Sequence, residues 1–272
     1  MNSAGARIAP LQIVNGAMFL AWVWKLRVFL LSDTIYRYRP LRVSFFPAFL
    51  QAPAVLELAY CAALAFSLIF GLRSTLTRAR VAGIVWLTSA GVLLCHEGAY
   101  NDATFVTVAW VALWMTWYAW RRRSTPEDEP IAAPFLAQAI IALVFLGGFV
   151  GKLTPGFLDG TVFYDIYLRD RDFWFFSLLR EYFAAETLPR LATGYAWLVV
   201  AVEGIGALSL FFPTRAALVF GIGVMFGMIV FNNFLLLSVL APLIGLACAG
   251  LWLESRRIRE SPRGATHGVL RA

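Results

Sequence analysis

The sequence predicts an all-α, polytopic integral membrane protein. Its 272 residues are 60% hydrophobic and 14% charged, whereas soluble domains average about 45–50% apolar and 25% charged residues. The apolar residues are gathered into runs near the length of about 20 residues that a bilayer-spanning helix needs. Most arginines lie in short segments between these runs, which is typical of membrane helices with a fixed orientation. A lipid bilayer, and not nucleic acid, is therefore the expected partner of a chain with net charge +7.

Eight apolar runs predict about eight transmembrane helices in one transmembrane domain at 1–255. Six runs reach the spanning length of about 20 residues, while 81–95 reaches it only with its flanks. The stretch 215–253 is too long for one crossing, so Asn232 and Asn233 are expected to form a tight turn within it. We expect the helices at approximately 10–31, 53–72, 80–97, 103–120, 131–151, 191–212, 215–231 and 233–253.

The distribution of positive charge predicts that both termini are cytoplasmic. With eight spans, 13 arginines fall on the side of the termini and eight lysines or arginines on the other side, and cytoplasmic segments are enriched in such residues. We therefore expect a multi-pass protein of a bacterial inner membrane. It would carry a cytoplasmic linker at 121–130 and a basic cytoplasmic tail at 256–272. No apolar core ending in small residues precedes the first run, so no removable signal peptide is expected.

The segment 153–189 is expected to form a long outer loop. It mixes aromatic residues such as Phe157 and Trp174 with charged residues such as Asp165 and Arg180. Aromatic rings beside charged groups are typical of the headgroup zone of a bilayer, so we expect interfacial helices in this loop. Such a loop would cover a cavity between the spanning helices.

Polar and ionisable residues that are costly in a bilayer gather near the outer ends of the expected helices. Lys152 ends the fifth run, and Glu203 lies near the middle of the sixth. Lys25 and Glu57 lie near the outer ends of the first two helices. The outer turn before the fourth helix adds a further group, which consists of His96, Tyr100, Asn101 and Asp102. This pattern predicts a water-accessible pocket between helices at the outer face.

Each of these residues also has a purely structural interpretation. Lys152, at a helix end, is suited to extend its stem toward the lipid headgroups. Lys25 and Glu57 are suited to an ion pair between neighbouring helices, and an acid in mid-span such as Glu203 is expected to be neutral and hydrogen-bonded. His96 is one of two histidines in the chain, so no histidine-rich metal site is expected.

Several strings occur in the order and spacing found in the membrane domain of the vitamin K-dependent gamma-carboxylases and the bacterial proteins grouped with them as the HTTM superfamily. They are Phe-Pro at 46–47, Gly-Leu-Arg at 71–73, Tyr-Asn-Asp at 100–102, Gly-Lys-Leu at 151–153, Gly160, Glu203, Phe211, Phe212 and Arg215. From about residue 11 to 253, the chain resembles this superfamily. The resemblance implies that Lys152 is a base in an outward-facing site, and that a quinone or other apolar lipid is the ligand.

Gamma-carboxylation of glutamate itself is not expected. Ala103 stands where the family has a histidine, and residues 224–226 lack a second one. The family's large domain outside the membrane is also missing from the sequence. The two missing histidines would have assisted the lysine, and the missing domain would have held the protein substrate.

Functions from different classes follow from these observations. In the leading hypothesis, the protein acts on a quinone- or lipid-like molecule, with Lys152, Asp102 and Glu203 as catalytic residues. The residues expected to contact that molecule are Tyr100, Asn101, His96, Lys25 and Glu57. In the alternative, the protein is a noncatalytic membrane partner, namely an immunity, maturation or assembly factor that binds another protein. A transporter ranks third, and whether the protein is an enzyme stays open at this point.

Overall fold

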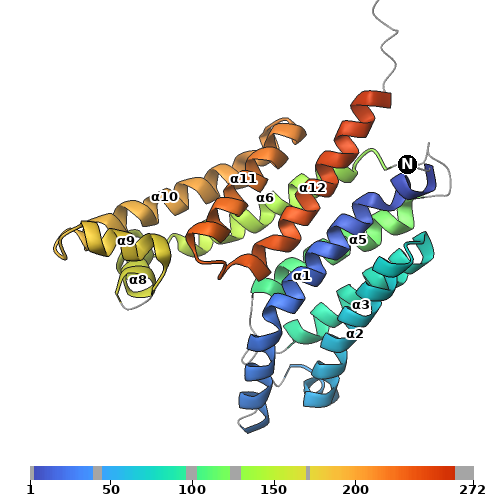
Figure 1. The fold of residues 1–272 in the computed structure, drawn as a ribbon, viewed down its shortest axis with the longest axis horizontal. Helices are drawn as coiled ribbons and strands as arrows, with labels where there is room; N and C mark the ends of the chain where they lie inside the picture. Colours follow the sequence, from blue (N-terminus) through green and yellow to red (C-terminus); the bar gives the residue numbers. More distant parts are fainter. Residues whose placement is uncertain (1–2, 39–44, 96–102, 123–129, 170–171, 261–272) are drawn as a thin grey trace, which may run out of the picture.

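The computed structural model describes residues 3–38, 45–95, 103–122, 130–169 and 172–260. All regular structure in these ranges is helical, which confirms the predicted all-α class. The long helices are α1 (Ser3–Tyr38), α2 (Pro53–Leu72), α3 (Leu76–Leu94), α5 (Ala103–Arg121), α6 (Ala133–Lys152), α10 (Leu188–Leu208), α11 (Thr214–Phe231) and α12 (Leu237–Glu260). Figure 1 shows their arrangement.

Six of the long helices are long and apolar enough to cross a membrane, as expected for a multi-pass membrane protein. They are α1, α2, α6, α10, α11 and α12. The other two, α3 and α5, fall short in apolar character: α3 carries Arg78 and Arg80 near its start, and α5 is rich in Trp, Tyr and Thr.

The helix boundaries differ most from expectation at α1 and α12. The first helix continues beyond residue 31 to Tyr38, because contacts of its last turns stabilise it. Arg37 pairs with Asp33 one turn earlier, and the Tyr36 hydroxyl donates to the Gln51 carbonyl. The last helix begins at Leu237 instead of 233, because residues 232–236 form the expected turn. Within that turn Asn233 has φ 49°, a left-handed conformation that asparagine tolerates better than most residues.

The helices α1, α2, α3, α5 and α12 form one packed unit, here called the main bundle (Figure 1). Its central member is α12, which packs against α1 and α5 within the bundle and against α6 and α11 outside it. In the most apolar stretch of 18 residues in α12, 61% of the residues are buried within the protein. In the other candidate spans this share is 28% to 39%. A Cβ atom on Gly245 would lie 2.3 Å from the Ala17 Cβ, so the close contact of α12 with α1 requires glycine.

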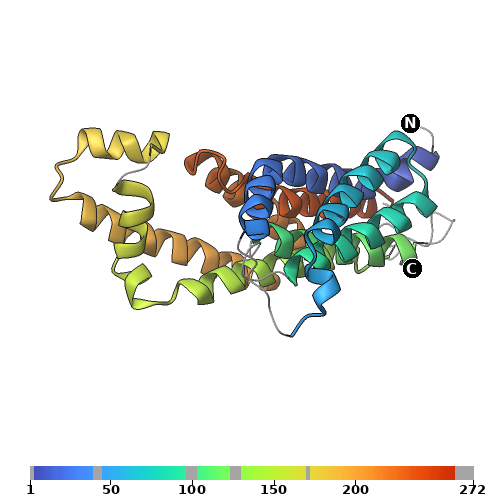
Figure 2. The same cartoon turned by 90° about the horizontal axis from the view of Figure 1, so that it is seen from below.

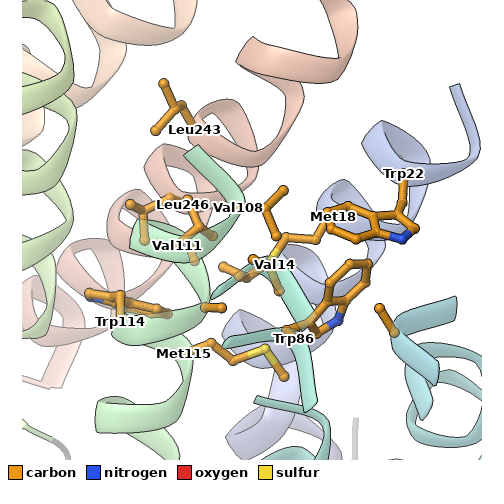
Figure 3. Packing of buried hydrophobic residues seen from close by; sticks show 14 of the residues in the cluster. Val14, Met18, Trp22, Trp86, Val108, Val111, Trp114, Met115, Leu243 and Leu246 are labelled. Atoms are coloured by element: carbon orange, nitrogen blue, oxygen red, sulfur yellow. The ribbon is translucent and has the colours of Figure 1, made fainter. Parts of the chain in front are cut away.

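The core of the main bundle is built on large aromatic residues whose polar atoms are bound internally. The Trp22 ring stacks on Tyr60, with centroids 5.0 Å apart, and Trp22 meets Trp86 edge to face (Figure 3). The Trp22 Nε1 donates to the Tyr60 carbonyl at 3.2 Å, and the Trp86 Nε1 donates to the Asn15 side chain at 3.1 Å. Such partners are needed because a bilayer offers no water to unpaired polar groups.

The remaining helices form a second unit, here called the lateral layer, made of α6, α10, α11 and the short helices that follow α6. Its core contact is between α6 and α10, and α6 also packs on α12. The short helices are α7 (Pro155–Leu158), α8 (Thr161–Phe163), the π-helix η3 (Tyr164–Leu168) and α9 (Trp174–Tyr182). Figure 2 shows that the part of the layer containing α8, α9 and the start of α10 projects beyond the main bundle.

The short helices of 153–189 are packed onto α10 and onto the turn between α11 and α12. Gly160 has φ 86°, and a Cβ atom there would lie 2.5 Å from the Thr193 backbone nitrogen of α10. At the other end, the Asn233 side chain accepts from the Trp174 backbone N–H at 3.2 Å and donates to the Asp172 carbonyl at 3.0 Å. The segment is therefore held against α10 near Gly160 and against the turn between α11 and α12 near Trp174.

Candidate functional site

A cavity of about 580 Å³ lies where the lateral layer meets the main bundle. Small-molecule sites usually have volumes of about 300–1,000 Å³, so the cavity has the size of a ligand site. Its wall is mostly apolar, and it takes residues from α5, α6, α10, α11, α12 and the short helices. The polar and charged residues of the wall are Thr107, Lys152, Tyr167, Tyr195, Glu203 and Asn232.

Lys152 and Glu203 form an ion pair in the wall of this cavity. The Lys152 Nζ lies 2.8 Å from each carboxylate oxygen of Glu203, and the two side chains are 28% and 6% exposed. The lysine belongs to the last turn of α6, and its Nζ points back along the helix to within 3.5 Å of the Gly148 carbonyl. The ammonium group is therefore directed into the protein and not outward from the helix end.

Glycines in both helices permit the close contact of α6 with α10. A Cβ atom on Gly148 would lie 3.0 Å from a Glu203 carboxylate oxygen, so glycine leaves the space that the carboxylate fills. On α10, a Cβ atom on Gly206 would lie 2.6 Å from the Phe145 ring. Within the glycine-rich string before Lys152, Gly148 thus has a packing role that also positions Glu203.

In the apolar wall, each charge of the pair neutralises the other. An isolated charge is costly to bury, and a buried pair requires good geometry and further hydrogen bonds. The carboxylate accepts through both oxygens, and the Phe157 ring centroid lies 5.9 Å from the Lys152 Nζ. Chemically, the pair presents an N–H donor and a carboxylate acceptor side by side on the cavity surface.

The cavity reaches the outer surface of the helices. Leu198 of α10 and Val106 of α5 both line the cavity, and they are 55% and 39% exposed. On α11, Gly223 and Gly227 line the cavity, and a Cβ atom on either would meet no other atom within 4 Å. A molecule in the cavity would therefore meet open space along α11 and would extend to the surface that an apolar bilayer would cover.

The other predicted site residues do not join this cavity in the part of the chain that the structure describes. Glu57 is paired with Arg37 and not with Lys25, because the longer α1 brings Arg37 next to it. Neither Lys25 nor Glu57 lines the cavity. Four further predicted residues, His96, Tyr100, Asn101 and Asp102, lie outside the described residues. The next residue, Ala103, does line the cavity.

Sequence reasoning missed the contribution of α11. Gly223 and Gly227 lie one helical turn apart and form open wall on the α11 side. Their spacing is the signal that could have identified them, because residues four apart share one face of a helix. Thr107 of α5 was also missed, and its hydroxyl donates to the Thr104 carbonyl at 3.0 Å.

Comparison of the chain with known protein families, with curated proteins and with solved structures finds no match in any of the three.

Proposed function

We propose that the protein is a multi-pass membrane protein that binds a quinone- or lipid-like molecule in the cavity, with its polar end at Lys152 and Glu203. The observation that carries the proposal is an apolar cavity of about 580 Å³ with an ion pair in its wall. Ligand sites typically combine such an apolar lining with a few placed polar groups. The exposure of Leu198 at the cavity wall supports access from the bilayer.

We further propose that all eight long helices cross the membrane, with both termini in the cytoplasm of a bacterial cell. Nineteen residues of α3 or α5 span about 28 Å at 1.5 Å per residue, close to the hydrocarbon thickness of about 30 Å. At the proposed cytoplasmic ends, arginines lie over tryptophan rings, as residues of the headgroup zone do. These pairs are Arg80 with Trp120 and Arg256 with Trp252.

Membership of the HTTM superfamily is part of the same proposal. It is supported by the order of the motifs along the chain and by the position of Lys152, which the resemblance implies is the base. Lys152 lines the cavity and touches Glu203. In an enzyme of this kind, the Glu203 carboxylate, 2.8 Å from the Nζ, would orient the Lys152 amine in the cavity wall.

Native mass spectrometry of the protein, purified in mild detergent, tests the proposed function. The wild type should carry a lipid-like molecule, and Gly227→Leu should lose it, because the new side chain would occupy the open space in the cavity. Gly147→Leu is the matched control: Gly147 also has open space around it, but it is outside the cavity wall. This control should keep the ligand.

The result that would contradict the proposal is a ligand that Gly227→Leu retains as well as the wild type does. A stoichiometric protein partner in place of the small molecule would instead support the noncatalytic alternative. Uptake of a solute by proteoliposomes would support a transporter.

A further inference from the structure

The charge of the cavity wall is balanced by its own residues. Among the described residues that line the cavity, Lys152 and Glu203 are the charged ones. They are in direct contact, with both carboxylate oxygens 2.8 Å from the Nζ. Since the positive charge of Lys152 is compensated by an acid that is 6% exposed, the described wall offers no net charge to a ligand.

The hydrogen-bonding capacity of the pair is not exhausted by its internal contacts. An ammonium group has three donors. The two Glu203 oxygens at 2.8 Å take two of them, and the third has only a long contact of 3.5 Å to the Gly148 carbonyl, which a closer acceptor on a ligand would replace. Each carboxylate oxygen has two lone pairs, so Glu203 keeps accepting capacity beside the amine. A group that both accepts from the Nζ and donates to a Glu203 oxygen therefore fits the pair.

The charge of a ligand's polar end decides whether that fit is favourable. An anionic head near Lys152 would also lie near the Glu203 carboxylate, so repulsion would offset the attraction while the head still lost its hydration. A cationic head would meet the same conflict with Lys152. A hydroxyl group carries no charge to desolvate and supplies one donor and two acceptor sites.

We infer that the cavity selects lipids whose polar end is an uncharged hydroxyl-type group, and that Glu203 is the residue that excludes anionic lipids. This inference rests on the proposed function, and it adds the chemical class of the ligand and the residue that sets it. In Glu203→Gln the ammonium loses its partner charge, so an anionic lipid should supply the missing carboxylate and become the preferred ligand.

The test compares two probes of equal carbon-chain length, hexadecanol and palmitate. Each is titrated onto the purified full-length protein at pH 8.5, where the carboxyl group of palmitate is ionised. Native mass spectrometry reports the bound fraction of each. The wild type should prefer hexadecanol by at least about tenfold, which corresponds to about 1.4 kcal/mol. Glu203→Gln should reverse the order, with palmitate bound at least about tenfold more tightly than hexadecanol.

Glu186→Gln is the matched control, because it removes the same charge from an exposed acid outside the cavity. It should keep the wild-type preference for hexadecanol. Glutamine is close in shape to glutamate, so Glu203→Gln should remain folded. If that variant fails to fold, the preference of the wild type still decides whether the cavity selects uncharged heads.

The outcomes separate this inference from the proposed function. Equal or tighter binding of palmitate to the wild type would overturn the selection of uncharged heads and leave the lipid site in place. An unchanged order in folded Glu203→Gln would overturn the role of Glu203. Failure of both probes to bind would contradict the proposed function itself.

Discussion

The main bundle and the lateral layer differ in the surroundings of their buried polar groups. In the main bundle, Trp22, Tyr60 and Trp86 are at most 1% exposed, and their polar atoms are bound to backbone or side-chain partners within the packed core. In the lateral layer, Lys152 and Glu203 are bound to each other and border a cavity. The comparison teaches that burial alone does not mark a functional residue in this fold. A buried polar group next to open space is the candidate that this comparison favours.

Three glycines, one in the main bundle and two in the lateral layer, differ in a similar way. Gly245 of the main bundle lies at a helix contact where a Cβ atom would meet Ala17 at 2.3 Å. Gly223 and Gly227 of α11 have open space around them and line the cavity. Gly245 therefore serves close packing, whereas Gly223 and Gly227 leave open space in the cavity wall.

The largest expected effect on stability is in the main bundle. Trp22→Ala should destabilise the protein by about 3–5 kcal/mol, the usual cost of removing a buried tryptophan, because the ring is completely buried. Thermal unfolding in detergent measures this loss. Trp197→Ala, at a ring that is 54% exposed, is the control and should change stability little. Equal losses in the two variants would contradict the packing described for the bundle.

The next effect separates the ion pair's structural role from its role in binding. Lys152→Met leaves the Glu203 carboxylate buried without its partner and should cost about 3 kcal/mol, the lower end of the range for broken buried pairs, because Lys152 is 28% exposed. The double variant Lys152→Met/Glu203→Leu removes both charges and should be close to wild type in stability. Thermal unfolding measures both.

Ligand binding should respond differently to the same variants. Both the single and the double variant should lose the ligand in native mass spectrometry, because the polar contact is gone in each. A double variant that is stable and still carries the ligand would show that the pair is a structural element only, like the polar contacts of the main bundle.

The smallest expected effect is a pH dependence at the short helices of the lateral layer. The backbone N–H of Thr161 donates to the Asp159 carboxylate at 2.8 Å, which holds the pKa of Asp159 below its ordinary value. A lowered folded pKa means that this carboxylate stabilises the fold above the unfolded pKa of about 3.9, and that the stabilisation is lost as the pH falls further. The wild type should therefore be slightly more stable than Asp159→Ala at pH 7, and the difference should shrink below about pH 4. A difference in melting temperature that does not change with pH would contradict this assignment.

The fold class and the positions of the long helices could be predicted from the sequence because apolar run length encodes them. The expected helix at 53–72 has the bounds of α2, and the turn at Asn232 and Asn233 lies where it was expected. The extension of α1 to Tyr38 could not be predicted, because it depends on contacts with Gln51 and Glu57 from a later part of the chain.

The candidate site was only partly predictable. Lys152 and Glu203 were each identified as residues that are costly in a bilayer, yet they are 51 positions apart. Their pairing depends on the close contact of α6 with α10, which Gly148 permits. The same limit explains why a pair of Lys25 with Glu57 was expected and a pair of Arg37 with Glu57 is found. Residue type indicates which groups need a partner, and helix packing decides which partner each one has.

An experimental density map of the protein in a lipid environment tests the central claim most directly. We expect non-protein density in the cavity between α6, α10 and α11, with its polar end at hydrogen-bond distance, about 2.7–3.2 Å, from the Lys152 amine or the Glu203 carboxylate. A cavity closed by the surrounding side chains, with the Lys152 amine turned away from Glu203 toward the headgroups, would contradict it.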